Sequence, residues 1–292
     1  MLTTKKISAL INLLDDPDES VYDQVCRELL ELGEDVVPFL ESAWETSFDA
    51  ILQERIESII HQINFQSVLN GIRTWRDSKD KSLLEAAILL SKFQYADLDE
   101  NHIRDFIDQL TQDVWIELNS DYTALEKAGI FNKVFFEIYG FSGNKKTFHS
   151  PHNYFLNNVL DSRKGNPMSL SIIYLEVAKR LKVPIYGINL PEHFVLGFAK
   201  LPIEYIDKPT KEDILFYINP FNKGMFFQHQ DIDQFVKQLK LEMNDSFYLP
   251  CSHVSIVSRI ITSLIVAFHK AACEDKVDEL KLLLKCLRNQ AE

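Results

Sequence analysis

Residues 153–198 decide the fold. They read NYFLNNVLDSRKGNPMSLSIIYLEVAKRLKVPIYGINLPEHFVLGF, and NPFNKG follows at 219–224. Asparagine suits the N-cap of a helix and proline suits its first position, so Asn166 and Pro167 predict a helix start. Apolar residues then recur at helical spacing as far as residue 182. The stretch therefore predicts a mostly buried helix that leads directly into a sheet.

Four short strands are expected from apolar patterns of period two, at 185–188, 193–199, 214–219 and 225–227. Prolines lie in the segments between them, where no ladder hydrogen bond is needed. Helical patterns occupy most of the chain before and after these strands. A small, mainly antiparallel sheet inside a helical chain is α+β, and we do not expect a doubly wound α/β fold.

Composition excludes several classes of function. The net charge is −12 and no basic block interrupts it, which argues against nucleic acid or an anionic membrane as the main partner. No apolar run is long enough to span a bilayer, and the N-terminus is better interpreted as an amphipathic helix than as a signal peptide, so we expect a cytoplasmic protein. The four cysteines have no metal-type spacing and no nucleotide-binding loop is present. No metal and no cofactor are expected.

The helix start at Pro167 is where papain-type enzymes carry their nucleophile, because the positive end of a helix lowers the pKa of a thiol. The chain resembles the transglutaminase-like superfamily, whose members open this helix with Gly-x-Cys and follow it with Gly-Ile-Pro. Here the same positions read Gly-Asn-Pro at 165–167 and Lys-Val-Pro at 182–184. His193 matches the family histidine and Asn219 stands where the family carries aspartate. The resemblance implies a papain-like core whose cysteine is replaced by Pro167.

Within that superfamily the sequence resembles the SirB-type subgroup, which also carries proline at the cysteine position. The subgroup pattern G-x-P-x-S-L-S, then P-G-H-F and D-P-F-x-G, is similar to segments between 153 and 224. Three positions depart from it: Lys182 replaces a glycine, Glu192 replaces the glycine before the histidine, and Asn219 replaces the aspartate. These departures affect the expected chemistry more than the expected fold.

We expect three parts along the chain. Residues 1–65 form helical hairpins that resemble HEAT-type repeats, which commonly offer extended binding surfaces. Residues 66–250 form the transglutaminase-like, SirB-type core, and residues 251–292 form C-terminal helices that pack on it. The oligomeric state is left open.

The resemblance also gives the candidate site. His193 would be the remaining general base, and Asn219 could orient it, because an amide oxygen can accept from the ring N–H. Ser169 is the one hydroxyl near the helix start; it is either a speculative nucleophile or a capping residue. Three further residues are expected to line the cleft: Pro167, Met168 and Glu192.

Three functions fit these residues. The favoured one is a catalytically degenerate protein whose cleft binds a protein or peptide. The alternative is an atypical amide-bond hydrolase or transferase with His193 as base and the amides of Met168 and Ser169 as oxyanion donors. A purely structural protein is the third. Loss of the cysteine favours a protein that is not an enzyme.

Overall fold

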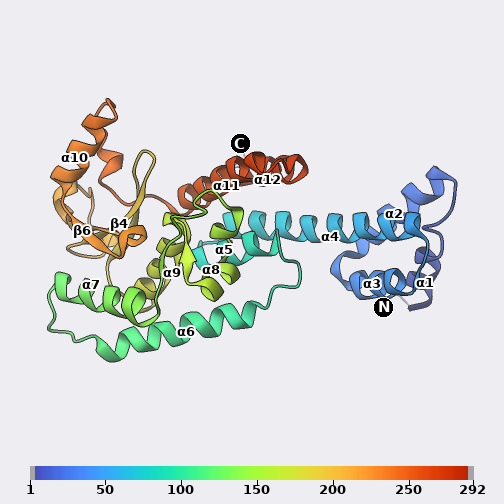
Figure 1. Cartoon of the computed structure of the whole chain (residues 1–292), viewed down its shortest axis with the longest axis horizontal. Helices are drawn as coiled ribbons and strands as arrows, with labels where there is room; N and C mark the ends of the chain where they lie inside the picture. The colour runs from blue at the N-terminus through green and yellow to red at the C-terminus, as the bar shows by residue number, and fades with distance from the viewer. Residues whose placement is uncertain (1–3, 289–292) are drawn as a thin grey trace. The chain divides into compact units, whose positions relative to one another are not determined.

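The computed structural model describes residues 4–288 and separates into two compact units, Met1–Thr74 and Trp75–Glu292 (Figure 1). Each unit has a core of its own. The units are described separately.

Unit 1 is a small bundle of helices. Its elements are α1 (Thr4–Ile11), α2 (Glu19–Leu32), η1 (Gly33–Val36), α3 (Val37–Thr46) and the greater part of α4 (Ala50–Asp77). Helix α2 is capped by Asp18, whose carboxylate accepts from the Ser20 amide at 2.8 Å. Gly33 ends that helix with φ 65°, a backbone conformation that favours glycine. The core is made of fully buried aliphatic side chains: Leu14, Leu29, Val36, Leu40, Ile56 and Ile59.

Unit 2 places a four-stranded sheet among helices. Before the sheet come α5 (Leu83–Lys92), α6 (Glu100–Glu117), α7 (Ala124–Asn132), the π-helix η2 (Lys133–Ile138), β1 (Ser142–Gly143), η3 (Pro151–Tyr154), α8 (Leu156–Ser162), β2 (Lys164–Gly165) and α9 (Pro167–Arg180). The sheet and its connections are β3 (Ile185–Asn189), β4 (Phe194–Ala199), η4 (Ile203–Tyr205), η5 (Lys211–Asp213), β5 (Ile214–Asn219), η6 (Pro220–Asn222) and β6 (Met225–Phe227). Then follow α10 (His229–Gln238), η7 (Asp245–Phe247), α11 (His253–Lys270) and α12 (Glu274–Arg288).

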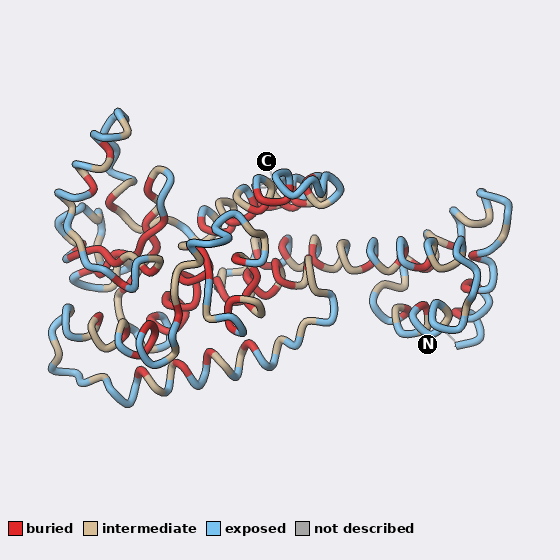
Figure 2. The backbone as a smooth tube through the Cα atoms, in the orientation of Figure 1, coloured by how far each residue is buried: buried red, intermediate tan, exposed pale blue. Residues whose placement is uncertain are grey.

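The sheet has the order β3-β4-β5-β6 and every neighbouring pair is antiparallel. This confirms the α+β expectation. Helix α9 is the most buried helix of the unit, with every residue from Met168 to Ala178 inside (Figure 2). It packs against β3 and β4.

The two faces of the sheet meet different helices. Val195 belongs to the face that packs on α10, in one apolar cluster with Ile232 and Val236. Successive side chains of a strand point to opposite faces, so Phe194 and Leu196 point away from α10. Phe194 lies beside the Ile256 side chain of α11, because a Cβ built on Gly187 would meet both of them. Helix α10 therefore covers one face, and α9 and α11 lie on the other.

One local expectation needs correction. The strand expected from His193 begins at Phe194, because the His193 amide donates to Pro191 O at 2.7 Å and Glu192 takes a left-handed φ of 58°. Before α9, the chain forms a 3-10 turn followed by α8. The segment after Gly140 contains β1, which pairs in parallel with β2 immediately before α9.

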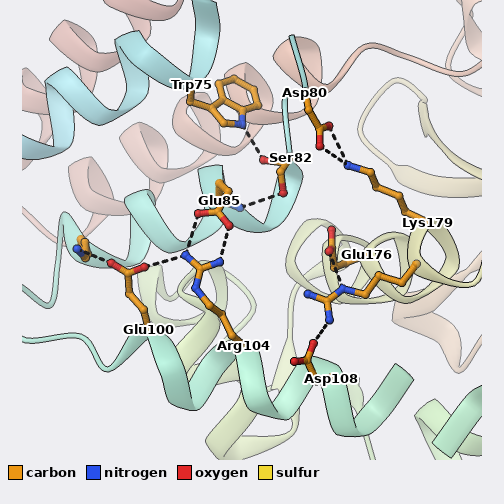
Figure 3. Close-up of polar contacts among 11 residues, drawn as sticks. Trp75, Asp80, Ser82, Glu85, Glu100, Arg104, Asp108, Glu176 and Lys179 are labelled. Atoms are coloured by element: carbon orange, nitrogen blue, oxygen red, sulfur yellow. Dashed lines mark hydrogen bonds and ion pairs between the residues drawn. The ribbon is translucent and has the colours of Figure 1, made fainter. Parts of the chain in front are cut away.

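Ion pairs fix the end of α9 to its neighbours (Figure 3). Lys179 pairs with Asp80 at 2.9 Å. Arg180 pairs with Glu176 at 2.9 Å and also with Asp108 of α6. The cations in the last turn of α9 thus have carboxylate partners.

Candidate functional site

The start of α9 is closed by the side chain of Asn166. Its Oδ1 accepts hydrogen bonds from the amides of Met168 and Ser169, both at 2.9 Å. Asn166 is only 3% exposed, so these bonds lie away from water. The first free amides of the helix are therefore satisfied by its own N-cap residue.

Ser169 completes this cap. Its Oγ accepts from the Asn166 amide at 3.1 Å and donates to Asn166 O at 3.3 Å. The side chain is 2% exposed. A Cβ built on Gly165 would come within 2.5 Å of this hydroxyl, so the glycine makes room for the cap. The hydroxyl thus occupies a capping position, with both its proton and an acceptor site in use.

The expectation that the Met168 and Ser169 amides are free oxyanion donors is wrong, because Asn166 Oδ1 occupies both. Pro167 stands at the first helical position, as expected, and Met168 is buried. Asn166 Nδ2 is a buried donor that has no hydrogen-bond partner within residues 4–288. The helix start therefore presents to its surroundings neither a nucleophile nor a pair of free amides.

His193 and Asn219 line a different cavity, of about 230 Å³, which we call the His193 pocket. It lies on the α10 face of the sheet. The pocket is lined by Leu190, His193, Val195, Asn219, Met225, Phe227, Asp231, Ile232 and Phe235. Pro167, Met168 and Ser169 are not part of this lining. Of the six predicted site residues, two line this pocket and four do not: Pro167, Met168, Ser169 and Glu192.

Within residues 4–288 no hydrogen bond joins His193 to Asn219. The His193 ring is exposed and meets Phe235 edge to face, with ring centroids 4.8 Å apart. Asn219 uses its Oδ1 to accept from the Asn222 amide at 3.2 Å, capping η6. Glu192 is exposed on the preceding turn and is not in the pocket lining. Asn219 therefore shares the cavity with His193 while its amide oxygen serves the backbone.

Sequence reasoning missed the apolar wall that α10 contributes to this pocket. Ile232, Phe235 and Val236 recur at helical spacing on α10 and form the covering face. That spacing was readable from the sequence. What it could not show was that this helix, and not α9, faces His193.

Cys251 lies beside a cavity of about 530 Å³. Burial raises the pKa of this thiol to about 11, and its Sγ donates to Gly187 O at 3.3 Å. A protonated thiol is a poor nucleophile. Within the described residues, no group of three or more His, Cys, Asp or Glu side chains is placed to hold a metal ion, and no helix is long and apolar enough to cross a membrane.

Comparisons with known proteins agree with this fold. A family model described as "Transglutaminase-like superfamily" matches residues 101–262, more than half of the chain. A UPF0162 protein of Xylella fastidiosa (strain 9a5c) is 30% identical over 233 residues, covering 74% of this chain and 75% of that protein. A UPF0162 protein of Vibrio cholerae is 32% identical over 102 residues, 34% of this chain and 33% of that protein.

The human F-box only protein 21 is 26% identical over 196 residues, which cover 58% of this chain and 30% of that protein. No solved structure matches the chain. The family model spans the α9 helix and the sheet that follows it. The chain belongs to the transglutaminase-like superfamily, with UPF0162 proteins among its relatives.

Proposed function

We propose that this chain is a non-catalytic member of its superfamily that binds a protein or peptide at the His193 pocket. The observation that carries the proposal is the closed start of α9. Pro167 stands where the thiol would be, and Asn166 Oδ1 takes the two amides that could hold an oxyanion. A site that cannot form or stabilise an acyl intermediate can still bind a protein or peptide.

The alternative, an amide-bond hydrolase with His193 as general base, has three requirements. It needs a nucleophile or an activated water, donors for the developing oxyanion, and a group that orients the base. Ser169 is buried in its own helix cap, and the donor amides are occupied. Asn219 directs its oxygen to the Asn222 amide. Each observation weighs against turnover.

The surroundings of the His193 pocket support binding of an extended peptide. β6 is an edge strand of the sheet, and Met225 and Phe227 on it line the pocket. Met225 is 51% exposed. Edge strands commonly accept an added peptide strand, with pockets that receive alternate side chains. A cavity of about 230 Å³ beside such an edge suits a single apolar side chain of the peptide.

We also assign the core to the SirB-type subgroup and unit 1 to HEAT-like helical hairpins. Pro167 and the Pro-Glu-His-Phe run at 191–194 support the first assignment. The helical bundle of unit 1 supports the second. The division at 1–65, 66–250 and 251–292 remains a prediction. All four cysteines are free thiols, which supports a reducing, cytoplasmic setting.

The test is a peptide-binding measurement on the full chain. An array of extended peptides is screened, and the strongest binder is titrated by fluorescence polarisation against wild type, Phe235→Ala and His193→Ala. Phe235→Ala should weaken binding at least about tenfold, because an aromatic anchor of a pocket carries much of the binding free energy. His149→Ala, in an exposed loop outside the pocket, is the matched control and should bind as wild type.

Turnover is scored in the same samples with glutamine-containing peptides, as deamidation, hydrolysis and amine incorporation. We expect none above the buffer rate. Turnover by wild type that disappears in His193→Ala would overturn the proposal and establish an enzyme.

A further inference from the structure

A third depression lies at the opposite end of α9 from Pro167, with a volume of about 450 Å³. We call it the lysine pocket. It is formed by the end of α6, the start of α7, the segment after α9, and strands β4 and β5. The lining residues are Trp115, Leu118, Asn119, Ser120, Ala124, Lys127, Leu181, Lys182, Val183, Pro184, Phe198, Lys200 and Leu215.

The charge of this lining is one-sided. It contains Lys127, Lys182 and Lys200 and no acidic side chain, although the whole chain carries a net charge of −12. No carboxylate within residues 4–288 forms an ion pair with any of the three. The pocket is therefore a local concentration of positive charge on an acidic protein.

The nearest acidic side chains are already engaged elsewhere. Glu117 pairs with Lys133 at 2.9 Å. Glu126 accepts from the Thr123 amide at 2.8 Å as part of a helix cap. Asp213 likewise accepts from the Thr210 amide at 2.9 Å, and this bond and the nearby Lys200 lower the pKa of that carboxyl group. Asp213 therefore offsets part of the charge of Lys200, although no ion pair joins the two, and Lys127 and Lys182 carry most of the positive charge of the pocket.

Compensation of helix dipoles does not account for the three lysines. The last turn of α9 already carries Lys179 and Arg180, each paired with carboxylates (Figure 3). Lys127 stands in the N-terminal half of α7, where a cation is disfavoured. Lys200 directly follows β4.

Lys182 stands at a position where glycine is expected. It has φ 54°, and the Val183 amide donates to Ala178 O at 2.9 Å, so Lys182 occupies the left-handed position that closes a helix. Glycine adopts that conformation without strain, and the family pattern has glycine there. A lysine at this position places a cation at the rim of the pocket.

The remaining lining is mainly apolar. Trp115 is 65% exposed, an unusual state for so large an apolar ring, and Leu215 and Pro184 lie in the same lining. Exposed tryptophan beside lysine suits a ligand with a planar ring and an anionic group. The volume lies in the range of small-molecule sites.

We propose that the lysine pocket binds a small organic phosphate with a planar ring, of the nucleoside diphosphate class. Three unpaired cations are matched better by a group with several negative charges than by one carboxylate. Phosphate oxygens accept from Lys127, Lys182 and Lys200, and the ring packs against Trp115. The site is separate from the His193 pocket and does not depend on peptide binding there.

The test uses the full chain with ADP as the probe, by calorimetry and by tryptophan fluorescence. Lys182→Gly should weaken ADP binding about tenfold, since it removes a charged donor, and it should not impair folding because glycine suits the left-handed position. Lys223→Gly is the matched control: Lys223 is an exposed lysine with φ 52° outside the lysine pocket, and this variant should bind as wild type.

The binding of ADP is compared with that of two other anions, pyrophosphate and a polyglutamate peptide. Pyrophosphate should bind more weakly than ADP, and Trp115→Ala should remove that difference. Equal binding of ADP and pyrophosphate by wild type would overturn the role of Trp115. Absence of ADP binding, equal loss in Lys182→Gly and Lys223→Gly, or a polyglutamate peptide that binds more tightly than ADP would each overturn the proposal, the last in favour of an acidic protein segment.

Discussion

The start of α9 and the His193 pocket were expected to form one site, but the two regions differ in burial and in hydrogen bonding. The helix start is buried, capped and internally satisfied by Asn166 and Ser169. The His193 pocket lies on the α10 face of the sheet, is lined mainly by apolar side chains and is bordered by the edge strand β6. One part of the expected site is therefore a buried structural element, while His193 in the other part stays exposed.

The largest effect is expected from Asn166→Ala. The change leaves two buried amides without an acceptor, so the free energy of unfolding should fall by about 3 kcal/mol. Urea unfolding of unit 2 can be followed by tryptophan fluorescence in a Trp44→Phe background, since Trp44 lies in unit 1. Asn101→Ala, at an exposed position of α6, should change stability little. A loss below about 0.5 kcal/mol in Asn166→Ala would refute the closed helix start.

Ser169→Ala comes next. Removing a buried capping hydroxyl should lower the free energy of unfolding by about 1.5 kcal/mol. Ser171→Ala, on the same helix, is the control; its hydroxyl donates to Pro167 O at 2.6 Å, and that carbonyl can accept within the helix, so about 0.5 kcal/mol is expected. If the two serines proved equivalent, Ser169 would have no special capping role.

A smaller effect on stability is expected at His193. The ring is exposed, so His193→Ala should change the free energy of unfolding by no more than about 0.5 kcal/mol. The same change should weaken peptide binding, because the ring lines the pocket beside Phe235. Urea unfolding should therefore show nearly unchanged stability for His193→Ala, while fluorescence polarisation should show weaker peptide binding. A stability loss as large as that of Ser169→Ala would show that His193 is a core residue.

The smallest effect is expected at Cys251. Because burial raises its pKa to about 11, the thiolate fraction at pH 8 is about one in a thousand, and it increases only as the pH approaches 11. Iodoacetamide at pH 8 should label the exposed Cys273 well before Cys251, as mass spectrometry of the digested protein can measure. Rapid labelling of Cys251 would instead mark an activated thiol.

The α+β fold could be predicted because its signals are local. Asn166 and Pro167 mark the start of α9, and the change from helical to alternating periodicity marks the sheet. The start of the second strand was predicted one residue too early, at His193. The left-handed conformation of Glu192 in the preceding turn has no signal in the sequence.

The candidate site could be predicted only in part. The resemblance grouped His193 and Asn219, and both line one cavity because His193 precedes β4 and Asn219 ends the neighbouring strand β5; their roles in that site stay predictions. It could not show that Asn166 Oδ1 takes the amides of Met168 and Ser169, since this depends on one side-chain rotamer. Nor could it show which face of the sheet receives α10, because that depends on chain connections far apart in the sequence.

Restoring the thiol tests the central claim most directly. Turnover of glutamine-containing peptides is measured for Pro167→Cys and for Pro167→Cys combined with His193→Ala, after unfolding measurements confirm that both variants fold. We predict no turnover in either variant, because the helix-start amides are occupied and position 167 is not part of the His193 pocket. Turnover by Pro167→Cys that disappears in the double variant would contradict this prediction and show that the two positions still form one catalytic site.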